Sequence, residues 1–439
     1  MHTYFFVFSL FFLPVVPALA QSPDDSLGNT ALTLDSAFRL ALENSVQLQI
    51  RHTGIDLARQ QTEIEKLARL PDLDASLDYG YLSNSYNYTP NFDKHTVVQV
   101  PHHLTLFTFE ASETLFSGGR ITNTIRKATL EEQIAYLDLA KDQVDIKFLV
   151  AASYLDIFRL LNERKVYIDN TRLARERLKN ILALRSQGLV TQNDVLRTEL
   201  TISDYELSTR DIARSVMEQN NQLNIVLGLP NTSLLIPDTT LITVEPQTGS
   251  IEALLDQAYR ENNEINISTK ERQIAETDLR IIKSQRSPTL GLIAQENFDR
   301  PYLTPPTDIY YDYFLAGVSL SYNIGSIYKS PRKIKAGYIN VDLAGRKDSL
   351  VKQNVELAVR NALIRYNQSI DQLQTARHDL RSAEENYRVV ERRYFNQLAL
   401  LTDLIDATNI KIEAELKVTN AEIDRIYTWY GLQKAIGII

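Results

Sequence analysis

The segment from Leu104 to Arg120, LTLFTFEASETLFSGGR, joins two different structural patterns. Its first part alternates apolar and polar residues, which is typical of a β-strand. The pair Gly118–Gly119 then suits a sharp change of direction, because glycine adopts backbone angles that other residues avoid. From Arg120 to Gln187 there is neither glycine nor proline. The segment therefore predicts a strand, a tight turn and a very long helix, in that order.

Long helices account for most of the chain. Glycine and proline are also absent from Leu189–Leu227 and from Arg346–Tyr430. At a rise of 1.5 Å per residue, nearly 70 helical residues form a rod of roughly 100 Å. We expect tight turns between antiparallel rods near Gly188 and between Gln397 and Leu400. On the last helix, apolar residues recur every three or four positions from Leu401 onward, which indicates a packing seam.

The two halves of the chain repeat one another. ALENSVQLQIRHTGIDLARQQTEIEKLARLPDLDASLDYGY has a partner in QAYRENNEINISTKERQIAETDLRIIKSQRSPTLGLIAQEN, and LRSQGLVTQNDVLRTE matches RYFNQLALLTDLIDAT, which places Asp194 on Asp403. Each half reads as helix, two strands, long helix, tight turn and second helix. The predicted repeats are 21–228 and 250–439, with a Pro/Thr-rich linker at 229–249. In the first repeat we expect strands at about 72–88 and 97–116, followed by a helical hairpin at about 120–227. In the second repeat we expect strands at about 288–299 and 310–324, followed by a helical hairpin at about 332–430.

The strands place apolar and polar residues on opposite faces. In LDASLDYGY, Leu73 and Leu77 share one face, and Asp74 and Asp78 share the other. Such segments are the signature of a membrane β-barrel, although a half-buried soluble sheet has the same period. The long helices favour the barrel. Asp74, Asp78 and Glu110 are then expected to line its interior.

Four strands per chain predict an oligomer. They cannot close a barrel, and open sheet edges do not occur in the hydrocarbon of a membrane. Two copies reach only the small, side-chain-filled barrel size, whereas three copies give a wider barrel that leaves a channel. The helices would continue this tube on one side of the membrane.

The N-terminus and the composition indicate an exported protein that does not bind nucleic acid. Residues 1–20, MHTYFFVFSLFFLPVVPALA, read as a signal peptide with an Ala-Leu-Ala cleavage site, and a transmembrane anchor is the alternative. No other stretch approaches 18 apolar residues, so no helical membrane span is expected. A formal net charge of −8 argues against a nucleic-acid partner. Cysteine is absent, which predicts no thiolate metal site and no N-terminal lipid anchor.

Several motifs resemble those of the outer-membrane efflux protein family, the TolC-like channels. They are LTLDSAFRLALENS, LPDLDASLDYGY, LFSGGR, GLVTQNDVL and LGLP, which occur in this order along the chain. The resemblance implies a homotrimer with a twelve-stranded β-barrel in the outer membrane, continuous with an α-helical barrel in the periplasm. It also implies docking to a periplasmic membrane-fusion adaptor and to an inner-membrane pump of the RND or ABC type. The second strand-to-helix turn, NIGSIYKSPRKI, departs from the pattern because it lacks the glycine pair.

The functional candidates lie at the hairpin tips. Threefold symmetry turns one carboxylate into a ring, and such rings favour cations in channels. The entrance and gate candidates are Asp403, Asp406, Arg392, Arg393, Tyr394 and Asp194. The alternative for the acidic residues is helix capping. The adaptor-contact candidates are Gly188, Leu189, Val190, Thr191, Leu398 and Leu400.

No catalytic constellation is visible, and no cofactor is expected. The six histidines are scattered, and no nucleophile elbow or phosphate loop occurs. The resemblance, together with this absence of catalytic groups, implies a passive exit duct of a tripartite efflux or type I secretion system. An exported coiled-coil adhesin or periplasmic structural protein is the second interpretation, but it leaves the duplicated strand pairs unexplained. A general diffusion porin is the third, and it leaves the helices unexplained.

Overall fold

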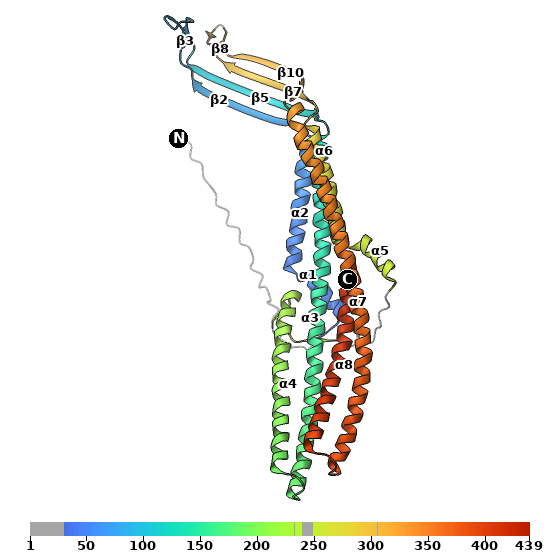
Figure 1. Cartoon of the computed structure of the whole chain (residues 1–439). Helices are drawn as coiled ribbons and strands as arrows, with labels where there is room; N and C mark the ends of the chain where they lie inside the picture. The colour runs from blue at the N-terminus through green and yellow to red at the C-terminus, as the bar shows by residue number, and fades with distance from the viewer. Residues whose placement is uncertain (1–29, 232, 239–248, 305) are drawn as a thin grey trace, which may run out of the picture.

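The computed structural model of the chain describes residues 30–231, 233–238, 249–304 and 306–439. The expected signal peptide at 1–20 lies outside these ranges. Residues 232 and 239–248 of the expected linker also lie outside them. The described part is an elongated molecule with a sheet at one end and two helical hairpins at the other (Figure 1).

Two long helical hairpins form the body of the molecule. In the first, α3 (Arg120–Ser186) turns back into α4 (Gln192–Leu227). In the second, α7 (Ser326–Phe395) turns back into α8 (Leu401–Ile436). The second hairpin therefore begins earlier than the predicted residue 332, because Pro331 lies in the second turn of α7, where its missing N–H removes only one helical hydrogen bond. It also ends later than residue 430, at Gly437, whose left-handed backbone caps the helix.

The helix that was expected before each strand pair is two helices. The first repeat has α1 (Leu34–Asn44) and α2 (Val46–Leu67), and the second has α5 (Ile251–Glu261) and α6 (Asn263–Ser284). The breaks fall at Ser45 and Asn262, which have extended backbones. The Asn262 side chain accepts hydrogen bonds from the first N–H groups of α6, so it stabilises the break as a helix cap.

Both breaks are tied to the ends of the hairpins in the same way. The Asn44 amide donates to the carbonyl of Leu227 at 2.8 Å, and the Asn262 amide donates to the carbonyl of Ala435 at 3.0 Å. These contacts hold the middle of the molecule together. The largest buried hydrophobic cluster lies there as well, between α1, α3 and the end of α4.

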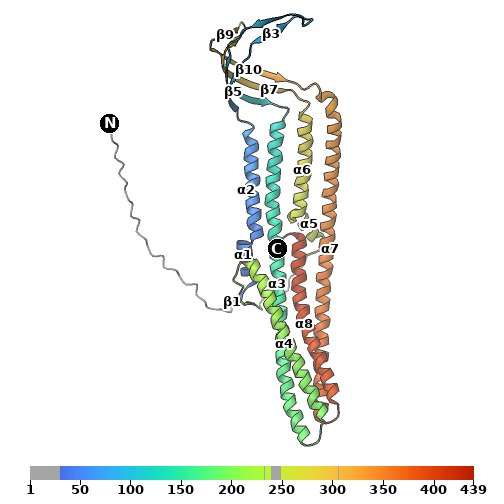
Figure 2. The same cartoon turned by 90° about the vertical axis from the view of Figure 1, so that its left-hand side faces the viewer.

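The helices form one layer whose membership changes along its length. Near the tips, α4 packs on α3, α3 on α8, and α8 on α7. Nearer the sheet, α2 packs on α3, α3 on α6, and α6 on α7. Figure 2 shows α2, α3, α6 and α7 side by side below the sheet. The edges of the layer are therefore α2 or α4 on one side and α7 on the other.

The four-stranded sheet combines the strand pairs of both repeats. Its order is β10 (Tyr311–Ser321), β7 (Thr289–Arg300), β5 (His103–Phe116) and β2 (Asp72–Tyr81), with antiparallel neighbours. The pairing puts Leu77 opposite Phe107 and Phe107 opposite Phe298 on one face. Asp74, Glu110 and Gln295 are in one row on the other face. The predicted alternation is therefore present.

The tips of the strand pairs form small separate hairpins. The strand predicted at 72–88 ends at Tyr81, and β3 (Ser85–Tyr88) pairs instead with β4 (His95–Val98). Pro101, which cannot donate to a ladder, separates β4 from β5. A shorter pair, β8 (Tyr302–Leu303) and β9 (Pro306–Thr307), lies between β7 and β10. Elsewhere, β1 (Thr30–Leu32) pairs in parallel with β6 (Leu235–Pro237).

The glycine pair makes the turn from sheet to helix. Gly118 and Gly119 have φ of 63° and 80°, which are left-handed values. A Cβ on Gly118 would lie 2.4 Å from the Cβ of Ser287, so the chain also needs glycine there for close packing.

Candidate functional site at the tips of the two helical hairpins

The first hairpin tip is closed by a reciprocal cap. Gly188 has φ of 75° and ends α3. The Asp194 carboxylate then accepts hydrogen bonds from the Thr191 backbone N–H and hydroxyl, both at 2.8 Å. The Asp194 N–H donates to the Thr191 hydroxyl at 3.3 Å. Asp194 is therefore a capping group of α4.

The second tip has a similar backbone but only half of the reciprocal cap, because Leu400 lacks the hydroxyl that Thr191 supplies in the first tip. Gln397 has φ of 62°, the conformation that Gly188 has in the first tip. Asp403 accepts a hydrogen bond from the backbone N–H of Leu400 at 3.0 Å, so it caps α8 as Asp194 caps α4. Asp406 lies one turn further along α8 and is exposed, without a hydrogen bond or ion pair to any residue that the structure describes. Of the three acidic candidates, only Asp406 is free of a capping role.

Tyr394 lies between the two hairpins rather than on the surface. Its ring packs with Ile181, Val195, Leu401 and Leu404 in a buried cluster at the tip. Its hydroxyl is buried and has no hydrogen-bond partner among the described residues. Burial raises the pKa of the Tyr394 hydroxyl, and the nearby charge of Asp194 raises it further.

The neighbouring arginines are exposed and make few contacts. Arg393 donates to the carbonyl of Leu398 at 3.4 Å, and the Arg392 side chain points to solvent. The structure therefore does not bring Arg392, Arg393 and Tyr394 together as one cluster.

A polar contact between the hairpins was missed by the sequence analysis. Arg177 of α3 is buried and donates to the hydroxyl of Tyr387 on α7 at 3.2 Å. Tyr387 in turn donates to Glu391 at 2.5 Å, and the ammonium of Lys411 lies 5.1 Å from the centre of its ring. Burial raises the pKa of Tyr387, and the bond to Glu391 adds to this. The i,i+4 spacing of Tyr387 and Glu391 was the only signal in the sequence, since Arg177 resembles many surface arginines.

The adaptor-contact candidates differ in how they are placed. Leu189, Leu398 and Leu400 are exposed at the extreme end of the molecule, at 48%, 67% and 70%. Val190 packs against the buried tip cluster instead. Gly188 and Thr191 form the turn and the cap of the first tip. The tips therefore present three exposed leucines next to polar backbone turns.

The barrel candidates lie at the other end of the molecule. Asp74, Asp78 and Glu110 are on one face of the sheet, and the register adds Asp72 and Asp299 to this face. None of the residues of β2, β5, β7 and β10 on this face is basic.

The described residues also bear on two other kinds of site. The described residues hold no group of three or more His, Cys, Asp or Glu side chains placed to bind a metal ion. Within the same ranges, none of the helices combines the length and apolar character that crossing a membrane requires.

Known proteins match this architecture over nearly the whole chain. The family model described as "Outer membrane efflux protein" matches residues 37–229 and 254–438. Outer membrane protein TolC of Escherichia coli (strain K12) is 22% identical over 450 residues, which cover 97% of this chain and 86% of the relative. Proteases secretion protein PrtF of Dickeya chrysanthemi is 29% identical over 128 residues, which cover 28% of this chain and 24% of PrtF. The crystal structure of outer membrane protein VceC of Vibrio cholerae is similar in fold, with a TM-score of 0.75 at 15% identity, covering 92% of this chain and 96% of VceC.

Proposed function

This chain belongs to the outer membrane efflux protein family, and we infer that it is a passive exit duct of the outer membrane, serving efflux or type I secretion. The observation that carries this function is the continuity of a membrane-type sheet with helices of roughly 100 Å, long enough to extend far into the periplasm. Such a molecule guides cargo through a water-filled path and performs no chemistry. The energy for transport must therefore come from a partner.

The duct assembles as a homotrimer. Both edge strands of the sheet, β2 and β10, lack a second neighbour within the described part of the chain, and almost all of their residues are exposed. A membrane strand with unpaired N–H and C=O groups is unstable in hydrocarbon, so β2 of one copy must pair with β10 of another. Each copy supplies four strands to the sheet, and three copies supply twelve, a barrel wide enough for a channel. The proposed repeats, 21–228 and 250–439, each contribute two of the four strands.

The acidic face of the sheet lines the barrel, and the hairpin tips receive the partners. The apolar face, with Leu77, Phe107 and Val318, is exposed and suits contact with lipid. At the far end, Leu189, Leu398 and Leu400 offer apolar contacts to a periplasmic membrane-fusion adaptor, which connects the duct to an inner-membrane pump of the RND or ABC type.

The first experiment tests the assembly and its location. The protein extracted from membranes in mild detergent is expected in the outer-membrane fraction as a heat-sensitive trimer, and to conduct ions in planar bilayers. A soluble monomer or dimer in the periplasm would contradict the duct and would favour a periplasmic structural protein.

The second experiment tests the periplasmic entrance. Asp406 is the most direct candidate, because it has no capping role. In a trimer it forms a ring of three carboxylates, so Asp406→Asn should lower the preference for cations and change single-channel conductance. Asp403→Asn also removes a helix cap, and the matched control for that loss is Asp194→Asn at the equivalent cap. An effect of Asp403→Asn beyond that of Asp194→Asn assigns Asp403 to the entrance. Unchanged conductance and selectivity in Asp406→Asn would remove it from the entrance.

A further inference from the structure

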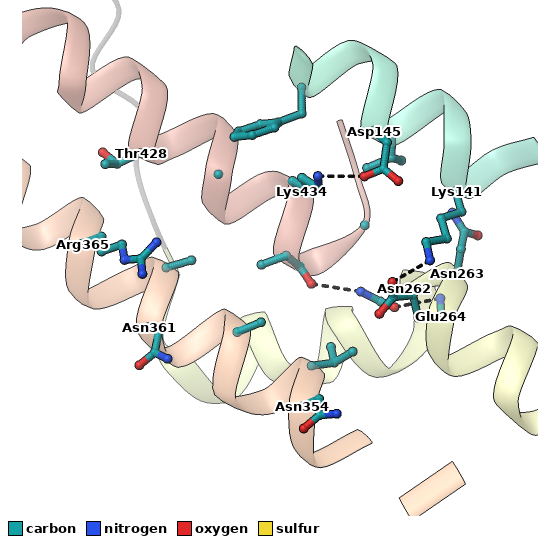
Figure 3. A pocket seen from close by; sticks show the side chains of 18 of the residues that line it. Lys141, Asp145, Asn262, Asn263, Glu264, Asn354, Asn361, Arg365, Thr428 and Lys434 are labelled. Atoms are coloured by element: carbon teal, nitrogen blue, oxygen red, sulfur yellow. Dashed lines mark hydrogen bonds and ion pairs between the residues drawn. The ribbon is translucent and has the colours of Figure 1, made fainter. Parts of the chain in front are cut away.

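A cleft near the middle of the molecule has no role in the functions described above. It has a volume of about 660 Å³ and lies between α3, α7, α8 and the break between α5 and α6. Figure 3 shows side chains from all of these elements around it. Its size falls within the range of small-molecule sites.

Two ion pairs fix one side of the cleft. Lys141 of α3 contacts Glu264 of α6 at 2.8 Å, and Lys434 of α8 contacts Asp145 of α3 at 2.7 Å. The Lys434 ammonium also lies 4.8 Å from the ring centre of Phe148. The cap residue Asn262 completes this side through its bond to Ala435. Because each lysine has an acidic partner, this side of the cleft is close to neutral.

Arg365 is exposed, and it is the one cation of the cleft without a partner among the residues that the structure describes. It points toward the cavity from α7, on the side away from the two lysines (Figure 3). It makes no hydrogen bond or ion pair with any residue that the structure describes. A guanidinium is always charged and presents a planar set of donors that matches the two oxygens of a carboxylate or sulfonate. The cleft therefore offers one unoccupied anion-binding group.

The rest of the cleft lining is mixed. Asn263, Asn354, Asn361 and Thr428 are polar, whereas Phe148, Val355, Ala358 and Ala435 form an apolar part of the surface. Gly431 is within the helix α8, where glycine is less favourable than alanine. A Cβ at this position would lie 3.9 Å from the Phe148 ring, so a longer side chain would extend over the aromatic wall.

From these contacts we propose that the cleft binds a small amphiphilic anion, an apolar ring or chain that carries a carboxylate or sulfonate. The apolar body lies over Phe148 and Gly431, and the anionic group pairs with Arg365. A cation is disfavoured because the only unpaired charge among the described residues of the cleft is positive, and a purely polar anion leaves the apolar surface uncovered. The site needs one folded chain only, so it does not depend on the duct being open or on its partners.

The test uses 8-anilinonaphthalene-1-sulfonate as the probe and the single tryptophan, Trp429, as the reporter. Trp429 lies on α8 between cleft residues Thr428 and Gly431, close enough for energy transfer to the bound dye. The full protein in mild detergent is titrated with the dye and, separately, with N-phenyl-1-naphthylamine, the analogue without the sulfonate. We expect the anionic dye to bind about tenfold more tightly than the neutral one, the ratio expected for one charge-assisted pair.

Variants separate the charge from the shape. Arg365→Ala should abolish the preference for the anionic dye, whereas Arg365→Lys should retain most of it. Gly431→Leu should weaken the binding of both dyes. Unchanged helical circular dichroism is the check that this variant still folds. Arg360→Ala on the same helix, at an arginine that is paired with Glu356, is the matched control and should bind like the unaltered protein.

Two results would overturn the site. One is equal affinity of the unaltered protein for both dyes, and the other is an anionic preference that survives Arg365→Ala. Neither result bears on the duct, because channel conductance of the same preparation in planar bilayers is measured separately.

Discussion

The turns of the two hairpin tips differ at Gln397. Its φ of 62° is left-handed, and the first tip uses Gly188 at φ of 75° for the same purpose. A side chain in this region costs about 1 kcal/mol, because its Cβ crowds the following carbonyl. The cost is tolerated where the turn is held by other contacts, and here the Asp403 cap and the buried Tyr394 hold it.

We predict that Gln397→Gly stabilises the second tip. Local opening, followed by amide hydrogen exchange over residues 390–404, should become about fivefold rarer, which corresponds to about 1 kcal/mol. The reciprocal change, Gly188→Gln, should make opening of the first tip more frequent by a similar factor. This change measures only the cost of the left-handed backbone, because a Cβ at Gly188 meets no other atom within 4 Å. If Gln397→Gly leaves exchange unchanged, the left-handed turn is not strained.

For single residues, the sequence predicts where in the fold a residue lies better than it predicts which distant residue it contacts. Matching LRSQGLVTQNDV to its repeat placed Gln397 at the second tip, where the structure has it. It did not predict the contact of Arg177 with Tyr387, because these two residues lie 210 positions apart in the sequence. The faces of the long helix α3 differ little in hydrophobicity, so the sequence around a buried arginine has no distinctive pattern.

At the scale of elements, a buried carboxylate anchors the shorter helix of each repeat to its long helix. Asp142 accepts from Arg51 at 2.7 Å and from Gln47 at 2.9 Å, which joins α3 to α2. Asp348 accepts from Ser268 at 2.8 Å and from Lys352 at 2.9 Å, which joins α7 to α6. Each lies 22 residues after the start of its long helix (120 to 142, and 326 to 348). The anchors therefore repeat with the duplication.

These anchors predict a dependence of stability on acid pH. Burial alone would raise the pKa of Asp142 and Asp348, but the hydrogen bonds and cations around them outweigh burial and lower both values. A carboxylate with a lowered pKa stabilises the fold above its unfolded pKa of about 4 and loses that contribution as pH falls through the folded value. Asp142→Asn with Asp348→Asn should therefore cost about 2 kcal/mol per site at pH 7.

The expected signature is a stability difference from the unaltered protein that is constant from pH 7 to about pH 5 and shrinks below about pH 4. It is measured as the thermal unfolding midpoint by circular dichroism at each pH. Asp342→Asn is the matched control, because Asp342 pairs with Arg346 on an exposed surface and should have little effect at any pH. A difference that persists unchanged into acid would mean that charge does not hold the anchors.

The sequence predicts the elements themselves well, and the exceptions have physical causes. Strand alternation and the absence of glycine and proline are local signals, and the strands and long helices follow them. The breaks at Ser45 and Asn262 were not predicted, since they depend on amide contacts with Leu227 and Ala435 from distant segments. The parallel pair of β1 and β6 is equally non-local, and its strands have three residues each.

At the scale of the whole molecule, the two edges of the helical layer carry apolar stripes that nothing in the described chain covers. On α2, Ile50, Leu57 and Ile64 recur every seven residues and are at least half exposed. On α7 the same spacing joins Leu343, Leu350, Leu357 and Ile364, which are 49–62% exposed. A strict seven-residue repeat is the pattern of helices that supercoil around a partner helix. α2 and α7 are opposite edges of the layer. The start of α2 lies beside Asp142, and the start of α6 lies beside the equivalent Asp348 of α7, so Leu343 and Leu350 are the stripe residues of α7 at the level of α2. There the stripe of one copy faces that of the next.

The pairing of α2 with α7 between copies should therefore hold the helical part of the trimer together. Leu343→Glu with Leu350→Glu places two charges in this seam, and burying an unpaired charge costs several kcal/mol. We predict that this variant is extracted in mild detergent as a monomer, or as a trimer that dissociates at a much lower temperature, by native mass measurement. Leu57→Glu should act in the same direction from the opposite edge.

Ser349→Glu, exposed beside the stripe on α7, is the control and should leave the trimer intact. A full-sized, heat-resistant trimer in all of these variants would mean that the sheet edges alone join the copies, with β2 against β10.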